Sequence, residues 1–178
     1  MITSNKRPIS EPGDLRGFKI RVGEAEMGSR TFRLLGAEPT PIAMGELYTA
    51  LQLGTVDGQE NPTSHALNSK LYEVQKYLSI THHQHVFSPL IMNKAKFDSL
   101  PTDIQKVLRE TAQEVARSDL ELVRNSESRE IEELKAKGMI VNQANRKAFQ
   151  QALEPLYEEY AQKNGQEWRD LVAAIMAL

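Results

Sequence analysis

Residues Glu46–Pro62 read ELYTALQLGTVDGQENP, and this stretch decides the fold. Its first half predicts a short helix, because apolar residues recur at helical spacing up to Gly54, a residue type that commonly ends helices. Its second half predicts a stub of strand at 55–56, a tight turn at 57–58 and a polar loop at 59–61. α/β proteins present ligand contacts at strand ends in this way, although an ordinary solvated connection shows the same pattern.

In the segments on either side, predicted strands and helices alternate. Residues 18–22 alternate apolar and basic side chains, which predicts a strand, and they precede a helix that stops at Gly36. The long stretch 103–137 contains no glycine or proline and predicts a helix of approximately 50 Å. We therefore expect an α/β fold. The remaining predictions are an extended segment at 38–42, a helix at 62–74, strands at 77–81, 86–92 and 139–141, and helices at 145–163 and 166–177.

Composition excludes several classes of function. The chain has 178 residues, 40% of them hydrophobic, and a net charge of -2, which gives no case for binding nucleic acid. It has no cysteine, and no apolar run approaches the roughly 20 residues of a membrane span. No secretory signal peptide is recognisable, so the chain as written would remain in the cytoplasm. Cofactor-binding and catalytic motifs are absent, and we expect no cofactor and no enzyme activity.

One histidine cluster, His82 to His85, allows a metal site as an alternative interpretation. On a strand, His83 and His85 share a face, and together with Glu60 or Asp57 they could form a metal site. Such a site would make the protein a metal-dependent hydrolase. No further histidine or carboxylate stands at the usual ligand spacing nearby, which favours a packed or hydrogen-bonded histidine instead.

Arg21 is the stronger candidate for a binding residue. It stands near the end of the strand at 18–22 and is followed at once by Gly23. The planar guanidinium suits a carboxylate, which it binds through two parallel hydrogen bonds. A surface arginine on an edge strand has the same spacing, so the pattern alone leaves both interpretations open.

Several segments together resemble one protein family, the solute-binding subunits of tripartite ATP-independent periplasmic (TRAP) transporters of the dicarboxylate type. The likeness covers essentially the whole chain. The segments that carry it are Arg7–Ile9, Asp14–Val22, Leu35–Ala37, Pro39–Pro41, Glu46–Pro62, Glu73–Tyr77, Thr81–His83, Leu100–Pro101 and the long helix.

The resemblance implies a periplasmic-binding-protein-like clamp that closes on a small organic acid. Arg21 matches the arginine that pairs with the substrate carboxylate, and Asn61 matches an asparagine that supports it. Met44 matches a pocket-wall position that is often aromatic, and Glu24 matches a position that often carries a smaller or amide side chain. The family also implies a periplasmic location and membrane permease subunits as partners.

The resemblance further implies that the chain is a C-terminal portion of such a protein, with the first domain largely missing. Residues 1–85 and 127–178 are then the second ligand-binding lobe. Residues 86–126 are a strand and helix that normally pack on the first lobe. We expect their uncovered apolar residues to drive homo-oligomer formation, through arm exchange or apolar surface pairing. A binding-incompetent, self-associating fragment is the alternative function.

Overall fold

The structure, a computed structural model, describes residues 1–84 and 89–176. Within these residues the strands form one six-stranded mixed sheet in the order β3-β2-β4-β1-β5-β6. Strand β2 is parallel to β3 and β4, whereas β1 is antiparallel to β4 and β5. The strands are β1 Ile2–Ser4, β2 Lys19–Val22, β3 Glu38–Pro41, β4 Gly58–Glu60, β5 Tyr77–Ile80 and β6 Ile140–Gln143.

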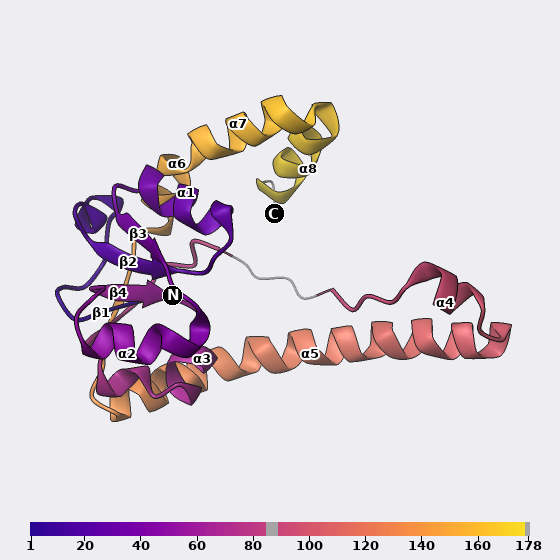
Figure 1. The fold of residues 1–178 in the computed structure, drawn as a ribbon, viewed down its shortest axis with the longest axis horizontal. Coiled ribbons are helices and arrows are strands. Elements are labelled where there is room, and N and C mark those ends of the chain that lie inside the picture. Colours follow the sequence, from indigo (N-terminus) through magenta and orange to yellow (C-terminus); the bar gives the residue numbers. More distant parts are fainter. Residues whose placement is uncertain (85–88, 177–178) are drawn as a thin grey trace.

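Helices cover both faces of the sheet (Figure 1). The core correspondingly has two clusters, one around Phe18, Phe32 and Phe149, and the other around Leu51 and Leu134. The α-helices are α1 Glu26–Leu34, α2 Leu47–Gln52, α3 Thr63–Asn68, α4 Lys94–Asp98, α5 Thr102–Ala136, α6 Arg146–Ala152, α7 Glu154–Asn164 and α8 Gln166–Met176. Short 3₁₀ helices are η1 Pro12–Leu15, η2 Met44–Glu46 and η3 Leu71–Glu73.

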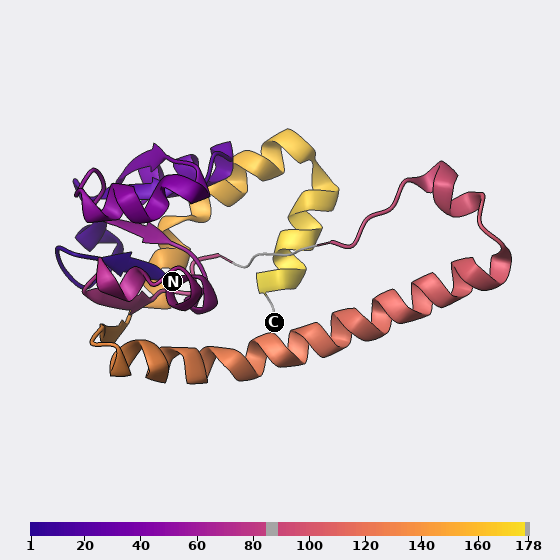
Figure 2. The same ribbon diagram turned by 60° about the horizontal axis from the view of Figure 1, so that its bottom comes forward.

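Helix α5 projects from the body as a long arm, and α4 folds back onto its far end (Figures 1 and 2). The Arg109 guanidinium lies 4.8 Å from the centre of the Phe97 ring, and Gln105 Nε2 donates to the Leu100 carbonyl at 2.9 Å. Only Leu134, at the base of the arm, is a buried residue of α5. None of the described helices is long and apolar enough to cross a membrane.

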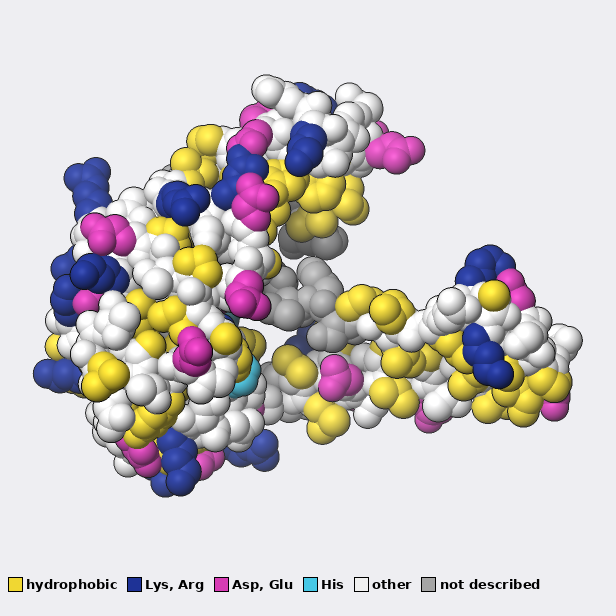
Figure 3. All heavy atoms as spheres, in the orientation of Figure 1, with side chains coloured by type: hydrophobic (Ala, Val, Ile, Leu, Met, Phe, Trp, Pro, Cys, Tyr) yellow, Lys and Arg dark blue, Asp and Glu magenta, His cyan; other side chains and the backbone are white. Residues whose placement is uncertain are grey.

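Apolar side chains remain exposed along this arm, as the yellow surface in Figure 3 shows. Leu90 and Ile91 are both 83% exposed, far more than apolar residues inside a core. The large apolar residues of α5 that are exposed are Ile104, Val107, Leu108, Val115, Leu120, Leu122 and Val123. The apolar side chains of the long helix are therefore largely uncovered.

The stretch that decides the fold differs from its prediction in one respect. The strand lies at Gly58–Glu60, where a turn and a polar loop were expected, and residues 55–57 form a bend. Gly58 fits between β1 and β2 because it has no side chain, and the next residue, Gln59, is a fully buried strand residue. The predicted helix at 47–52 and its stop at Gly54 are confirmed.

Three other predictions were wrong in detail. The helix expected at 62–74 ends at Asn68, because Lys70 adopts a left-handed backbone with φ of 51°. The helix expected at 145–163 is divided at Leu153 into α6 and α7. Of the strand expected at 86–92, residues 89–92 are not in a strand, and 86–88 lie outside the described residues.

Candidate functional site

Arg21 lies in the middle of the parallel part of the sheet, paired with Thr40 on β3 and Gln59 on β4. Its Nε donates to the Ile42 carbonyl at 2.8 Å, which fixes the guanidinium beside the end of β3. Among the described residues, the two terminal nitrogens have no hydrogen-bond partner. Burial lowers the pKa of Arg21, and the carboxylates of Glu60 and Glu24 oppose this effect.

Parallel strands bring the predicted binding residues to one edge of the sheet. Strands β2, β3 and β4 run in the same direction, so their carboxyl ends lie together. Glu24 follows β2, Met44 follows β3 and Asn61 follows β4. Glu24 and Met44 are exposed, whereas Asn61 is half-buried. The roles of these side chains as ligand contacts stay predictions.

A chain of buried hydrogen bonds positions Asn61, and sequence reasoning missed it. Asn61 Nδ2 donates to Gln59 Oε1 at 2.5 Å, and Gln59 Nε2 donates to Thr3 Oγ1 at 3.1 Å. Thr3 Oγ1 in turn donates to Gln75 Oε1 at 2.9 Å. Buried polar networks of this kind fix side-chain orientation when every member is satisfied. No motif marks Thr3 or Gln75, because the sheet alone brings them together.

His83 is buried near the carboxyl end of β4, where it lines a cavity together with Asn61. Its side chain is 1% exposed, its Nδ1 lies 2.6 Å from Thr81 Oγ1, and its ring meets Phe32 edge-on at 5.3 Å. Its Nε2 lies 3.7 Å from Glu60 Oε2 and has no hydrogen-bond partner. Burial lowers the pKa of His83, with smaller lowering contributions from the Met1 amino group and His82, while Glu60 acts in the opposite direction.

A cavity of about 300 Å³ adjoins these residues, between the loop after β4 and helix α5. Thr63 Oγ1 donates to Glu130 Oε2 at 2.6 Å, which ties the start of α3 to α5. His82 Nε2 lies 2.9 Å from Glu127 Oε1 on the same helix. The cavity has a mixed lining of the apolar residues Met1, Pro62 and Val123 and the polar residues Glu60, Asn61, Thr63, Ser64, His83, Gln84, Ser126, Glu127 and Glu130.

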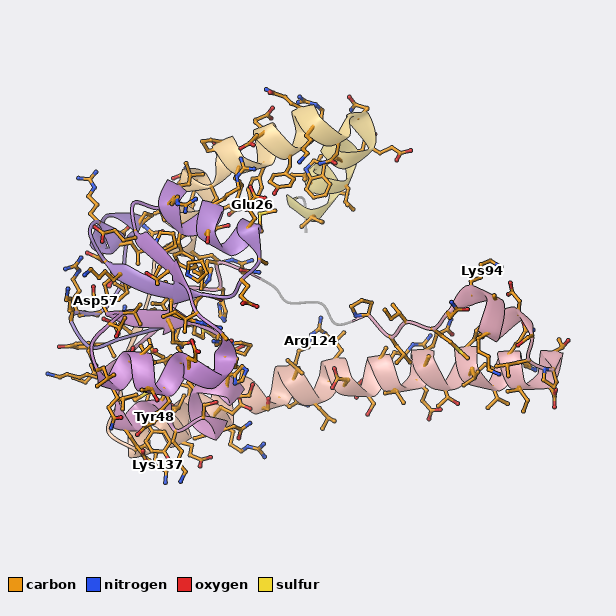
Figure 4. All side chains as sticks on the ribbon, in the orientation of Figure 1. Glu26, Tyr48, Asp57, Lys94, Arg124 and Lys137 are labelled. Atoms are coloured by element: carbon orange, nitrogen blue, oxygen red, sulfur yellow. The ribbon has the colours of Figure 1, made fainter. Side chains whose placement is uncertain are left out.

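The proposed metal site does not form within residues 1–84 and 89–176. No group of three or more histidine or acidic residues is arranged there to hold a metal ion. Asp57 lies at the amino end of β4, where it accepts from the Lys19 backbone amide at 2.8 Å and pairs with Lys6 at 2.9 Å. Figure 4 shows it on the side of the sheet away from the arm. His85 lies outside the described residues.

The model for bacterial extracellular solute-binding proteins of family 7 matches residues 1–164. The chain belongs to this family. The predicted resemblance to TRAP solute-binding subunits is thereby confirmed, and the family consists of solute-binding proteins rather than enzymes. The mixed α/β fold with its sheet and long helix agrees with a periplasmic-binding-protein-like domain.

Individual relatives of this family 7 chain bind different solutes. The chain is 36% identical to the 2,3-diketo-L-gulonate-binding periplasmic protein YiaO of Escherichia coli, over 98% of this chain and 53% of that protein. A TRAP solute-binding protein from Polaromonas sp., solved with D-erythronate, is 39% identical with a TM-score of 0.85, over 99% of this chain and 58% of that one.

A third relative from Sulfitobacter sp., solved with β-D-galacturonate, is 31% identical with a TM-score of 0.83, over 96% of this chain and 57% of that one. The chain thus spans about half the length of the curated relatives that it matches.

Proposed function

We propose that this chain captures a small organic acid through its carboxylate, as part of a TRAP-type solute-binding protein. The observation that carries the proposal is Arg21, a buried guanidinium whose Nε is anchored and whose terminal nitrogens have no protein partner among the described residues. The three relatives named above are described with 2,3-diketo-L-gulonate, D-erythronate and galacturonate, all of which are acids.

Burial makes Arg21 a stronger carboxylate receptor than a surface arginine would be. An ion pair of a solvent-exposed arginine contributes only about 0–1 kcal/mol. The side chain is instead 3% exposed, so solvent screens its charge less. Because the anchored Nε already satisfies one donor, the remaining donors are oriented before a ligand arrives, which lowers the entropy lost on binding.

Asn61 is proposed to support the same carboxylate, with Met44 and Glu24 shaping the rest of the ligand site. The hydrogen-bonded chain through Gln59 holds the Asn61 amide in a fixed orientation. Glu24 is exposed near Arg21 and would repel a second carboxylate on a ligand, whereas it would accept a hydrogen bond from a hydroxyl or amine.

The family context extends this proposal to transport. We place the protein in the periplasm, delivering its acid to the membrane permease subunits of the transporter. The division into one ligand-binding lobe, residues 1–85 and 127–178, and an arm, residues 86–126, belongs to the same proposal.

The arm is also proposed to pair with a second copy of this chain. Basic residues outnumber acidic ones over 94–109, and the reverse holds over 110–130. An antiparallel pair of arms therefore sets opposite charges against each other while covering the exposed apolar stripe.

A matched pair of sugars tests carboxylate recognition directly. D-galacturonate and D-galactose differ in that a carboxylate replaces a hydroxymethyl group. A ligand that binds the folded state raises the melting temperature by mass action, so we expect galacturonate to raise it and galactose to leave it unchanged. Equal shifts with both sugars would show that the carboxylate is not what the site recognises.

A further inference from the structure

The two outer strands of the sheet differ in the backbone groups that they leave unpaired. Strand β3 ends the sheet on one side and β6 ends it on the other. An outer strand presents N–H and C=O groups that are a template for pairing with another chain, and proteins commonly block or cover them. In the described part of the chain, the β3 edge is blocked and the β6 edge is not.

Two prolines block the β3 edge. The backbone amides of Glu38 and Ile42 donate inward, to carbonyl groups of the segment 18–22. Because successive residues of a strand in a parallel pair direct their backbone groups to opposite sides, Pro39 and Pro41 hold the outward positions. Proline has no backbone N–H, so β3 offers no outward donor to an added strand.

Strand β6 has the same geometry without the prolines. The backbone amides of Ile140 and Ala144 donate inward, toward β5. Val141 and Gln143 therefore direct their N–H and C=O groups outward, where these groups have no hydrogen-bond partner among the described residues. Ile140 is 50% exposed and Gln143 is exposed as well, so solvent reaches both ends of the strand.

The chain on both sides of β6 is basic. The basic residues between positions 134 and 153 are Lys135, Lys137, Arg146 and Lys147. That stretch contains no acidic residue, and all four basic side chains are exposed. Lys135 pairs with Glu132, whereas Arg146 and Lys147 form no ion pair with any described residue. The edge therefore combines free backbone groups with positive charge before and after the strand.

This charge favours an acidic partner over a second copy of the chain. Antiparallel pairing of two β6 strands about their middle would bring Lys137 of one copy opposite Arg146 of the other. Like charges in such positions repel, so self-pairing is disfavoured. An extended segment with acidic residues meets the opposite charge at both ends of β6.

We propose that the β6 edge binds an extended acidic segment of another protein by strand addition. The added strand forms main-chain hydrogen bonds with Val141 and Gln143, and its acidic residues lie beside the basic ones at the two ends of β6. Ile140 is an apolar neighbour for one of its side chains. Strands β4, β1 and β5 separate β6 from Arg21 on β2, so this binding does not depend on carboxylate capture.

Amide hydrogen exchange followed by NMR tests the free edge without any variant. In the dilute chain, Val141 and Gln143 should exchange much faster than Ile140 and Ala144, whose amides donate toward β5. Slow exchange at Val141 and Gln143 under these conditions would show that the edge is already covered, and would overturn the proposal. Protection that appears only as the chain is concentrated would assign the edge to a second copy, which would overturn it too.

A pair of synthetic peptides tests the partner. One alternates valine and threonine and carries glutamates at both ends, and the control replaces these glutamates by lysines. We expect the acidic peptide to slow exchange at Val141 and Gln143 and to bind roughly tenfold more tightly than the control, since several weak exposed ion pairs add together. Equal binding of the two peptides, binding of neither, or protection confined to residues outside β6 would overturn the proposal.

Variants then separate the local charge from the net charge. Arg146→Glu with Lys147→Glu should remove the preference for the acidic peptide. Arg33→Glu with Lys163→Glu is the matched control, because it changes the net charge equally at exposed positions of α1 and α7, and it should keep the preference. Equal loss in both double variants would assign the effect to net charge and overturn the site. Gln143→Pro gives β6 an outward proline like those of β3, and unchanged binding of the acidic peptide would contradict strand addition.

Discussion

Gly58→Ala provides the sharpest structural test of how the site is built. Gly58 begins β4 and lies between β1 and β2, so it sets the position of Asn61 three residues later. A Cβ atom added at Gly58 would lie 2.1 Å from the Thr3 carbonyl oxygen and 2.8 Å from Phe18 Cζ. The first of these neighbours is backbone in the adjacent strand, and it cannot move aside as a flexible side chain would.

The expected loss in the free energy of unfolding follows from this geometry. The Cβ–oxygen separation must grow by about 1 Å, which forces β1 away from β4. Overpacking of this kind costs about 1–3 kcal/mol. Weakening two hydrogen bonds of the β1–β4 ladder adds about 1 kcal/mol each. We therefore expect a loss of about 3–5 kcal/mol, a large share of the roughly 5–15 kcal/mol by which a typical domain is stable.

Urea denaturation followed by circular dichroism measures this loss. Gly13→Ala is the matched control, because a Cβ there meets no atom within 4 Å and the backbone is not in the left-handed region. We expect the control to change the free energy of unfolding by less than about 0.5 kcal/mol. A Gly58→Ala variant as stable as this control would refute the packing of β4 between β1 and β2.

Three further predictions concern the interior and the arm. The free energy of unfolding should fall as pH decreases from 7 to about 5.5, because burial lowers the pKa of His83 and the unfolded chain takes up a proton near pH 6.5 that the folded chain does not. His83→Phe should flatten this part of the pH dependence, and an unchanged slope would show that the folded histidine titrates normally. Thr3→Val removes the hydroxyl between Gln59 and Gln75 and should cost about 1–3 kcal/mol in urea denaturation, whereas a neutral effect would contradict the hydrogen-bonded chain. Sedimentation at micromolar concentration should show dimers that a Leu90→Asp, Ile91→Asp double variant converts to monomers, and a wild-type monomer would contradict pairing through the arm.

The sequence predicts the long helix and several of the strands well because their signals are local. The long helix follows from an uninterrupted run without glycine or proline, and the strand at Lys19–Val22 follows from its alternation. Strand β1 was missed, since Ile2–Ser4 lies in a polar, turn-rich segment and becomes a strand only by pairing with β4 and β5. Long-range pairing of this kind has no local signature.

The candidate site was likewise predictable from the sequence only in part. Arg21 was singled out from its place near a strand end, and the family resemblance added Asn61. The strand order then explains why residues forty positions apart share one edge of the sheet. The burial of Arg21 could not be predicted, because it depends on how β3 and β4 pair with β2 on either side in the sheet. The same holds for the buried Nε2 of His83, which depends on contacts from Phe32 and Thr81.

Carboxylate capture by Arg21 is tested most directly by titration calorimetry of D-galacturonate into two arginine-to-lysine variants. Arg21→Lys keeps the positive charge but loses the fork that forms two parallel hydrogen bonds and the Nε contact with Ile42. Arg33→Lys is the matched control on the exposed side of α1. We predict that Arg21→Lys weakens binding by roughly a hundredfold, on the order of 3 kcal/mol, while Arg33→Lys binds like the wild type. Equal affinities for wild type and Arg21→Lys would contradict the claim that this guanidinium receives the acid.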